Sequence, residues 1–490
     1  LSRQMLIEHL VLAGIAAVVA VGVAALLLNL LSLTRLVPAS QLARAGLGVD
    51  ALTFLVGLMT LTAVTLGWIV SRRATRSAAM TGTLRTQSSS RESVRLRHAL
   101  VSIEVGAAVV LLLAATLLLQ SAARLMQVDP GFRTENVITF QVGLPISRYA
   151  NVNDRVRFID GVVEKLGQLP GVTAAASGAF SPMTTMRATR RFAIDGKPMP
   201  APGTEPIAID LPAGPGYASL MGLRIIDGRW ISDRDRTDSA PVVVISESFA
   251  RQYFAGERAV GRRLRYYAGL QPNAPPPPVP EIVGVVSDVR QFGVAEAEAP
   301  QMYVPHAQRA WTFTSFFVRT ASDPRAVISS LPAAVHALDP ERPLEKVETL
   351  EERVSQSTAD RRALSALLMI AAVVAVLISA IGVYGVTAAT TNARRRELAI
   401  RAAIGADSRR LVRLVVQQGL EAAAVGVVIG LAAGLTASSV LEAVLYEVAP
   451  RNPVTAGAVA LALLGISAVA CYLPARRAIT VNPATALNEP

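Results

Sequence analysis

The chain has 490 residues, of which 52% are hydrophobic and only 17% are charged. Soluble globular proteins have about 25% charged residues, so part of this chain is expected to face lipid. The single cysteine, Cys471, excludes a disulfide framework within the chain and any cysteine-rich zinc cluster. The formal net charge of +12 would suit a nucleic-acid-binding protein, but its distribution along the chain indicates a membrane protein instead.

Long apolar runs are the first signal along the chain, and six of them reach the length of about 20 residues that a helix needs to cross a bilayer. They occupy residues 10–33, 51–70, 98–120, 364–388, 419–441 and 455–474. The first run is too long for the apolar region of a signal peptide, so we interpret it as a span. The sequence therefore predicts an α-helical membrane protein with six transmembrane helices.

Arginines gather in three segments that fall on one side of this six-span arrangement. Segment 72–98 has seven arginines against one glutamate, segment 391–413 has seven against two acids, and the tail 475–490 has two against one. Because basic loops mark the cytoplasmic side, both termini are expected in the cytoplasm and the protein in a bacterial plasma (inner) membrane. Membrane lipid is an expected partner. Nucleic acid is not, since no aromatic residues are interleaved with the arginines.

Residues 121–363 form one large hydrophilic segment, which this topology places outside the cytoplasm. Short β-rich runs alternate in it with helical patterns. The β-rich runs are 136–142, 241–246, 281–286 and 316–320, and the helical patterns are 156–169 and 324–338. This alternation predicts an α/β (α+β) extracytoplasmic domain of two subdomains.

The two ends of the chain resemble each other. An Arg-Arg-Ala triplet follows the second apolar run at 72–74 and the sixth at 476–478, and residues 3–10 resemble 413–420 in pattern. We therefore expect 1–77 to be the last two spans of a partial first module, joined by a basic cytoplasmic linker, 78–97, to a complete module.

Motifs for catalysis are missing from the sequence. It holds no GxxxxGK[ST] phosphate loop, and no HExxH, GxSxG or GxGxxG in a credible context. The four histidines are scattered and form no ligand pattern. The sequence therefore predicts no catalytic residue, no cofactor site and no metal site, and the chain is not expected to be an enzyme.

The strongest functional signal is RRRELAIRAAIGADSRRLVRLVV at 394–416, directly after the fourth apolar run. The segment is amphipathic. Gly405 can end one helix, and Asp407 or Ser408 can cap the next. Such a helix, turn and helix on the cytoplasmic membrane face suits docking on a cytoplasmic partner. From the residues alone, a simple interfacial helix is an equally good interpretation.

This segment resembles the cytoplasmic motif of FtsX-type and MacB-type ABC transporter permeases, R-x-x-E-[IL]-x-I-R-x-A-[LI]-G-A. The matching positions are Arg394, Glu397, Leu398, Ile400, Arg401, Ala403, Ile404, Gly405 and Ala406. The runs VDPGF (128–132), VVVISESFAR (242–251) and IVGVVSDVR (282–290) resemble the periplasmic core domain of that family. The end of the chain, 474–487, resembles its closing motif, with Asn482 where aspartate is usual.

The resemblance implies a domain order for the complete module. Its parts are a first span, 98–120, a MacB-like periplasmic core domain, 121–363, an FtsX-like permease domain with three spans, 364–474, containing a coupling segment, 391–413, and a cytoplasmic tail, 475–490. With the partial module before it, the chain is similar to duplicated orphan permeases that lack a fused ATPase, in an amino-truncated form.

The resemblance also implies a function, that of the permease subunit of an ABC-type exporter for a drug, peptide or lipoprotein-like substrate. A separate cytoplasmic ATPase would dock on Arg394, Glu397, Leu398, Ile400, Arg401, Gly405 and Ala406. Other implied partners are a periplasmic adaptor and a second module, in a homodimer or a two-module pseudo-dimer. The alternative is a transmembrane regulatory scaffold that controls a periplasmic partner such as a cell-wall hydrolase.

Two further features lie inside apolar runs. Gly426, Gly430 and Gly434 are four residues apart on one helix face, which permits close helix packing, either static or as a sliding interface. Glu104 is a carboxylate in the third run. It is either a functional intramembrane group or one that nearby basic residues and the positive helix end stabilise.

Overall fold

The computed structural model describes most of the chain from residue 88 onward and scattered positions before it. The described residues are 7, 11, 14–22, 25–26, 48–50, 53–54, 56–57, 59–61, 64, 88–201, 203–267, 278–394, 397, 400–401, 404, 407–441 and 445–479. They fall into two compact units, one formed by 1–126 together with 359–490 and the other by 127–358. We call these the helical unit and the sheet unit.

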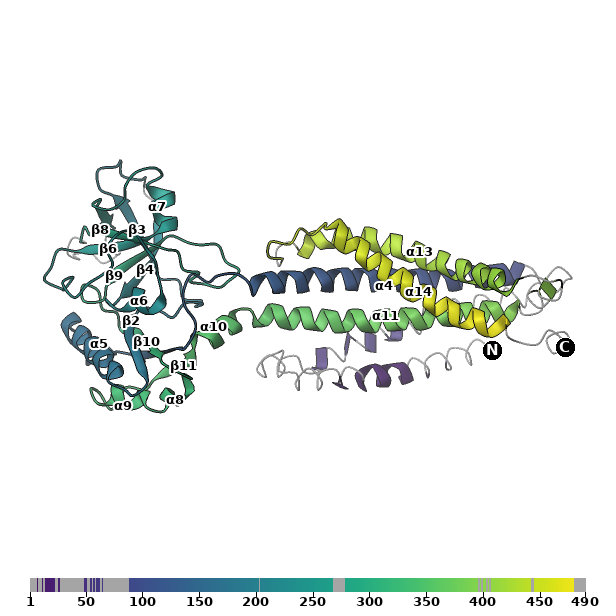
Figure 1. Cartoon of the computed structure of the whole chain (residues 1–490), viewed down its shortest axis with the longest axis horizontal. Helices are drawn as coiled ribbons and strands as arrows, with labels where there is room; N and C mark the ends of the chain where they lie inside the picture. The colour runs from purple at the N-terminus through teal and green to yellow at the C-terminus, as the bar shows by residue number, and fades with distance from the viewer. Residues whose placement is uncertain are drawn as a thin grey trace. The chain divides into compact units, whose positions relative to one another are not determined.

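Four long helices make up the described core of the helical unit (Figure 1). They are α4 (Ser88–Leu125), α11 (Ala359–Ala393), α13 (Ser408–Leu441) and α14 (Pro453–Ile479). Each contains a stretch long and apolar enough to cross a membrane. Four predicted spans are therefore present as helices, whereas 10–33 and 51–70 lie largely outside the described residues.

Local sequence signals set the ends of two of these helices. Asp407 precedes α13, and its Oδ1 accepts the Arg409 backbone N–H at 3.1 Å, as expected for a capping aspartate. Asn452 precedes α14 in the same way, with its Oδ1 accepting from Val454 N at 3.0 Å. Pro453 occupies the first helical position, where a missing N–H is harmless.

The four helices pack through small residues. In the packed interior α4 and α14 contribute four side chains each, α13 three and α11 one. These are Val101, Val105, Ala108, Val109, Val383, Ala422, Ala423, Val427, Val459, Leu463, Ala470 and Cys471. The opposite faces expose large apolar side chains such as Ile103, Ile381 and Leu461. An apolar outer surface is stable only against lipid, so the helical unit has the surface of a membrane domain.

The sheet unit is built on one mixed sheet of eleven strands among the described residues. The strands are β1 (Val137–Gly143), β2 (Val172–Gly178), β3 (Thr189–Ile194), β4 (Ile207–Ala213), β5 (Ile225–Gly228), β6 (Val242–Ser246), β7 (Leu264–Tyr266), β8 (Glu281–Val286), β9 (Gln301–Pro305), β10 (Phe313–Thr320) and β11 (Glu345–Thr349). The main path runs β11-β1-β10-β2-β4-β9-β6-β8-β5, and β3 and β7 branch from β4.

Six helices accompany this sheet among the described residues, namely α5 (Val152–Gly167), α6 (Tyr217–Met221), α7 (Glu247–Tyr253), α8 (Arg325–Ile328), α9 (Leu331–His336) and α10 (Leu350–Ser357). Two hydrophobic clusters of described residues join helices to the sheet. One joins α5 and α9 to β1 and β10, and the other joins α7 to β6, β8 and β9. The sheet unit is therefore a mixed α/β domain.

The two halves of the sheet meet at one point. Strands β2 and β4 share a single residue pair, Gly178 with Ala213. Gly178 is required there, because a Cβ at this position would lie 2.9 Å from a ring carbon of Tyr217 and 3.0 Å from one of Phe317. Because β2 and β4 pair at only one residue, this narrow joint between the two halves of the sheet leaves room beside it for a cleft.

The four β-rich runs predicted from the sequence coincide with β1, β6, β8 and β10. The helical pattern predicted at 324–338 is present as two short helices, α8 and α9. Pro332 is in the first turn of α9. A proline inside a continuous helix removes a hydrogen bond and clashes with the preceding turn, so the helix ends and restarts.

Candidate functional site

The coupling segment begins where α11 ends. Arg394 follows Ala393, and its backbone N–H still bonds to the carbonyls of Thr390 and Thr391. Its guanidinium Nη1 donates to Gln418 Oε1 of α13 at 3.2 Å. This bond ties the start of the segment to the next long helix, so the segment is attached to α11 by the chain and to α13 by a side chain.

Glu397 and Arg401 form an ion pair on the surface of the segment. Their Oε1 and Nη2 atoms are 2.6 Å apart, at the i, i+4 spacing of residues on one helix face. Both side chains are about half exposed, so the pair stabilises the helix by only about 0.2–0.5 kcal/mol. Because the pair contributes so little to folding, its charges remain available to a partner.

Two apolar side chains of the same segment are exposed to solvent. Ile400 is 45% exposed and Ile404 is 82% exposed. Exposed isoleucines beside an exposed ion pair give the mixed surface typical of protein interfaces. Leu398, Gly405 and Ala406, which the motif also includes, lie outside the described residues.

A cavity of about 250 Å³ lies between this segment and three long helices. Its polar lining comes from α4, α11, α13 and the segment itself, and consists of His98, Thr387, Thr390, Thr391, Arg394, Glu397, Arg401, Gln418 and Glu421. The hydroxyls of all three threonines bond to carbonyls of their own helix. The segment therefore borders a polar cavity instead of packing tightly on the long helices, and the cavity gives it room to move.

The three glycines of α13 face α4 at very close range. A Cβ on Gly426 would lie 2.5 Å from the Ser102 carbonyl oxygen, and one on Gly430 would lie 2.6 Å from that of Gly106. A Cβ on Gly434 would instead lie 2.9 Å from Cδ2 of the Leu113 side chain. Sequence reasoning identified the α13 glycines but missed Gly106, their counterpart on α4, because it is a single glycine in its run.

Glu104 projects from α4 toward α11. Its carboxylate occupies the space that Gly382 leaves free, since a Cβ on Gly382 would collide with Glu104 Oε2. A carboxylate seated on a glycine of the neighbouring helix fixes how α4 and α11 pack, and this geometry is compatible with a structural or a functional role.

The described residues contain no group of three or more His, Cys, Asp or Glu side chains that could hold a metal ion. The one cysteine, Cys471, is buried in the helical unit.

Family comparisons agree with this geometry. Residues 369–483 match the family of the FtsX-like permease C-terminal region, and residues 103–334 match the MacB-like periplasmic core domain. The chain belongs to the MacB-type permeases. It contains an FtsX-like permease region, and most of its sheet unit lies within the match to the MacB-like periplasmic core domain.

Several curated proteins are similar to this permease. The macrolide export ATP-binding/permease protein MacB of Chromobacterium violaceum is 28% identical over 286 residues, covering 56% of this chain and 42% of MacB. The pyoverdine export ATP-binding/permease protein PvdT of Pseudomonas putida is 25% identical over 282 residues, with the same coverages. The uncharacterized ABC transporter permease YknZ of Bacillus subtilis is 23% identical over 284 residues, covering 56% of this chain and 68% of YknZ.

The match to MacB and PvdT spans less than half the length of those two relatives. Among solved structures, the periplasmic region of MacB from Actinobacillus actinomycetemcomitans aligns with a TM-score of 0.32 at 16% identity. This alignment covers 47% of the present chain and 95% of that region.

Proposed function

We propose that this chain is the permease subunit of an ABC-type exporter. A separate cytoplasmic ATPase docks on residues 391–413, and its ATP cycle changes the shape of the periplasmic domain. That change drives efflux of a drug, peptide or lipoprotein-like substrate. The family supports the permease role. The coupling mechanism is supported by the exposed segment at the end of α11.

The connectivity of α11 is the observation that carries this proposal. The helix runs without interruption from Ala359 to Ala393, about 50 Å at 1.5 Å per residue. Its first residue follows the sheet unit directly, and the coupling segment follows its last. A force on the segment is therefore applied to the continuous helix whose other end is covalently joined to the sheet unit.

The test is stimulation of the ATPase that copurifies with the chain from native membranes, measured in reconstituted complexes at equal expression. Glu397→Lys places a positive charge where the docking surface has a negative one. It should abolish stimulation, since like charges that face each other across an interface cost several kcal/mol. Glu447→Lys is the matched control, because it makes the same change at an exposed position in the connection between α13 and α14.

A second variant separates docking from helix stability. The swap Glu397→Arg/Arg401→Glu restores an ion pair within the segment but presents both charges to the partner in reversed positions. If the segment docks on an ATPase, the swap should fail like Glu397→Lys. Stimulation that the swap rescues, or that Glu397→Lys leaves unchanged, would contradict docking through this surface.

A further inference from the structure

A cleft of about 560 Å³ opens in the sheet unit beside the narrow joint between its two halves. Its floor lies at the carboxyl ends of the parallel strands β4 and β9, whose last pair is Ala213 with Pro305. The His306 N–H continues this pairing by donating to Ala213 O at 3.0 Å. Small-molecule sites have volumes of about 300–1,000 Å³, and crevices at the carboxyl ends of parallel strands often hold ligands.

The first wall of the cleft is one face of α5. The lining residues Asn153, Val156, Arg157 and Asp160 have the i, i+3, i+4, i+7 spacing of a single helix face. The opposite face packs into the first hydrophobic cluster with Phe158, Ile159, Val162 and Leu166. The second face supplies most of the core packing of α5. On the first face Arg157 is bound to Asp154 and Asp160 to His306, and each keeps further donor or acceptor positions for a ligand in the cleft.

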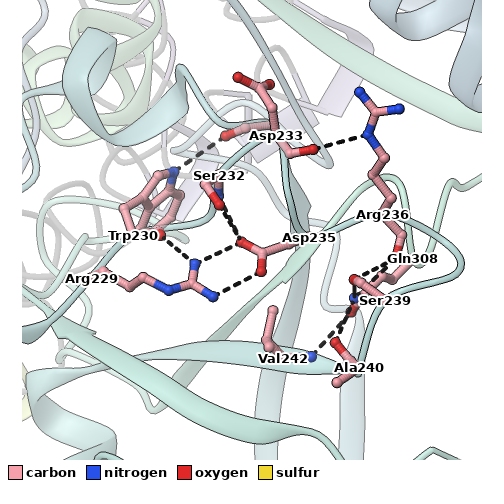
Figure 2. A network of polar contacts seen from close by, with 11 residues as sticks. Arg229, Trp230, Ser232, Asp233, Asp235, Arg236, Ser239, Ala240, Val242 and Gln308 are labelled. Atoms are coloured by element: carbon pink, nitrogen blue, oxygen red, sulfur yellow. Dashed lines mark hydrogen bonds and ion pairs between the residues drawn. The ribbon is translucent and has the colours of Figure 1, made fainter.

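The second wall is the loop 229–240, which Figure 2 shows as a closed network of polar contacts. Arg229 donates two hydrogen bonds to the Asp235 carboxylate, at 2.7 and 2.8 Å, and the same carboxylate accepts the N–H and the hydroxyl of Ser232. Gln308 binds the other end of the loop through the carbonyls of Arg236 and Ala240. The loop is thus rigid without any ligand, and the site is pre-formed.

The cleft has an excess of negative charge. Asp160, Asp233 and Asp238 line it, and neither Asp233 nor Asp238 pairs with a cation in the described part of the chain. The Arg157 guanidinium is bound to Asp154, which leaves Arg236 as the lining cation without a carboxylate partner among the described residues. The Asp160 carboxylate is bound to His306, so the two carboxylates of Asp233 and Asp238 face this one guanidinium, and their excess favours a positively charged ligand.

Apolar groups complete the lining. Val156 belongs to the helical wall, Ile231 to the loop, and Pro215 and Pro305 to the floor. A pre-formed cleft with an apolar surface and a few convergent charged groups is the usual make-up of a small-molecule site. A ligand that matches both the apolar lining and the carboxylates of the cleft has an apolar body and a cationic group.

A hydrolytic role for the same cleft conflicts with the geometry. His306 does lie between Asp160, at 2.7 Å, and Ser177, at 3.3 Å, the order of residues found in serine hydrolases. However, Ser177 is 1% exposed, and the space beside its hydroxyl is a cavity of only about 10 Å³. No substrate carbonyl can reach that oxygen, so the three residues act as a bridge between α5, β2 and the end of β9.

We propose that this cleft binds an amphiphilic organic cation of drug size. The cationic group faces Asp160, Asp233 and Asp238, and the apolar body packs on Val156, Ile231 and Pro215. Identifying this ligand as exported cargo rests on the proposed permease function, whereas its binding does not.

The test is equilibrium binding of a matched pair of xanthene dyes to the full chain in nanodiscs of zwitterionic lipid, without ATPase or nucleotide. Rhodamine 6G is the cation and fluorescein the anion. The test variant Asp233→Asn/Asp238→Asn removes two carboxylates that make no described contact, so folding is preserved. The control Glu164→Gln/Glu345→Gln removes two exposed charges outside the cleft. For each dye, partition into lipid is the same in all protein variants and cancels when the variants are compared.

We expect saturable rhodamine binding that the control variant retains. Each exposed charge pair adds about 0.2–1 kcal/mol, up to about five-fold in affinity, so the test variant should bind up to about twenty-five-fold more weakly. No saturable binding, equal binding of fluorescein, or equal affinity in test and control variants would each overturn the proposal. If the chain binds rhodamine but does not stimulate the ATPase, the binding proposal holds and the exporter function is contradicted. If it stimulates the ATPase but does not bind rhodamine, the exporter function holds and the binding proposal is contradicted.

Discussion

At the scale of single residues, Asp235 shows how one carboxylate holds a loop in place. Burial alone would raise its pKa, but the hydrogen bonds from Arg229 and Ser232 outweigh burial and hold the pKa below its usual value. Asp235 is 5% exposed, whereas the Arg229 side chain is about half exposed. Solvent around the partly exposed arginine weakens the pair. Its contribution to the free energy of unfolding is therefore near the lower end of the range for hydrogen bonds to charged groups.

We therefore predict that Asp235→Asn lowers the free energy of unfolding of the sheet unit by about 1–2 kcal/mol at pH 7. A lowered folded-state pKa stabilises the fold above the unfolded pKa of about 3.9, and this stabilisation is lost as the pH falls through the folded pKa. The difference between parent and variant should accordingly shrink below about pH 4. Tryptophan fluorescence during thermal unfolding of the full chain, recorded from pH 7 to 3, measures it.

The control for this variant is Asp227→Asn, which breaks the exposed pair with Arg258 in the same half of the sheet unit. It should change stability less than Asp235→Asn does. Equal losses in the two variants, or a difference that persists at pH 3, would show that Asp235 does not act through its charge.

The run SDRDRTD at 232–238 explains why sequence reasoning missed this network. Three aspartates and two arginines in seven residues are typical of a solvated loop. Spacing cannot tell that Asp235 is buried while Asp233 and Asp238 are exposed, because the distinction comes from Arg229 and Gln308 closing around the loop. The Glu397 and Arg401 pair was predictable, since it depends only on helix periodicity.

At the scale of elements, the contact of α4 with α13 depends on the glycines of α13. Atoms added to Gly426 or Gly430 would meet backbone carbonyl oxygens, which cannot move aside without moving α4. We predict that Gly426→Ala and Gly430→Ala each destabilise the helical unit by about 1–3 kcal/mol, the usual cost of overpacking. Thermal unfolding of the purified chain in detergent measures the loss.

Gly457 and Gly465 of α14 provide a matched control, because a Cβ at either position has no atom within 4 Å. Alanine there should be neutral or slightly stabilising, since alanine favours helix more than glycine does. If the α13 and α14 variants shift the melting temperature alike, close packing of α4 on α13 is not what holds these helices together.

Strands whose own residues have high β-propensity were predictable from the sequence. Strands that form only because a distant strand pairs with them were not. The valine-rich strands β6 and β8 were found from β-propensity, with bounds within one residue of those predicted. Strand β2, VTAAASG, is rich in alanine and glycine and has little propensity of its own. It forms because β10 pairs with it along most of its length, a contact between residues more than 130 positions apart.

At the scale of the whole molecule, the sheet unit should fold by itself. Its described residues form two hydrophobic clusters, and it is one compact body between residues 127 and 358. Domains of this size bury enough apolar surface to be stable alone. We predict that 127–358, secreted to the periplasm, is soluble and unfolds cooperatively, as followed by circular dichroism. A product that only aggregates would mean that the unit needs the helices or a partner for burial.

The orientation of the chain in the membrane is the last prediction. Basic loops stay in the cytoplasm, and the arginine-rich segments 72–98 and 391–413 and the tail all lie on one side of a six-span chain. Reporter fusions at residues 85, 400 and 485 should therefore read cytoplasmic, and a fusion at residue 230 should read outside. A fusion at residue 42 distinguishes a six-span topology from a four-span one. Residue 42 lies outside the cytoplasm only if residues 10–33 cross the membrane. A cytoplasmic reading at 42 would remove the first two spans and keep the rest. A cytoplasmic reading at 230 would reverse the sheet unit, place the arginines on the wrong side of the membrane, and remove the physical basis for an ATPase docking on 391–413.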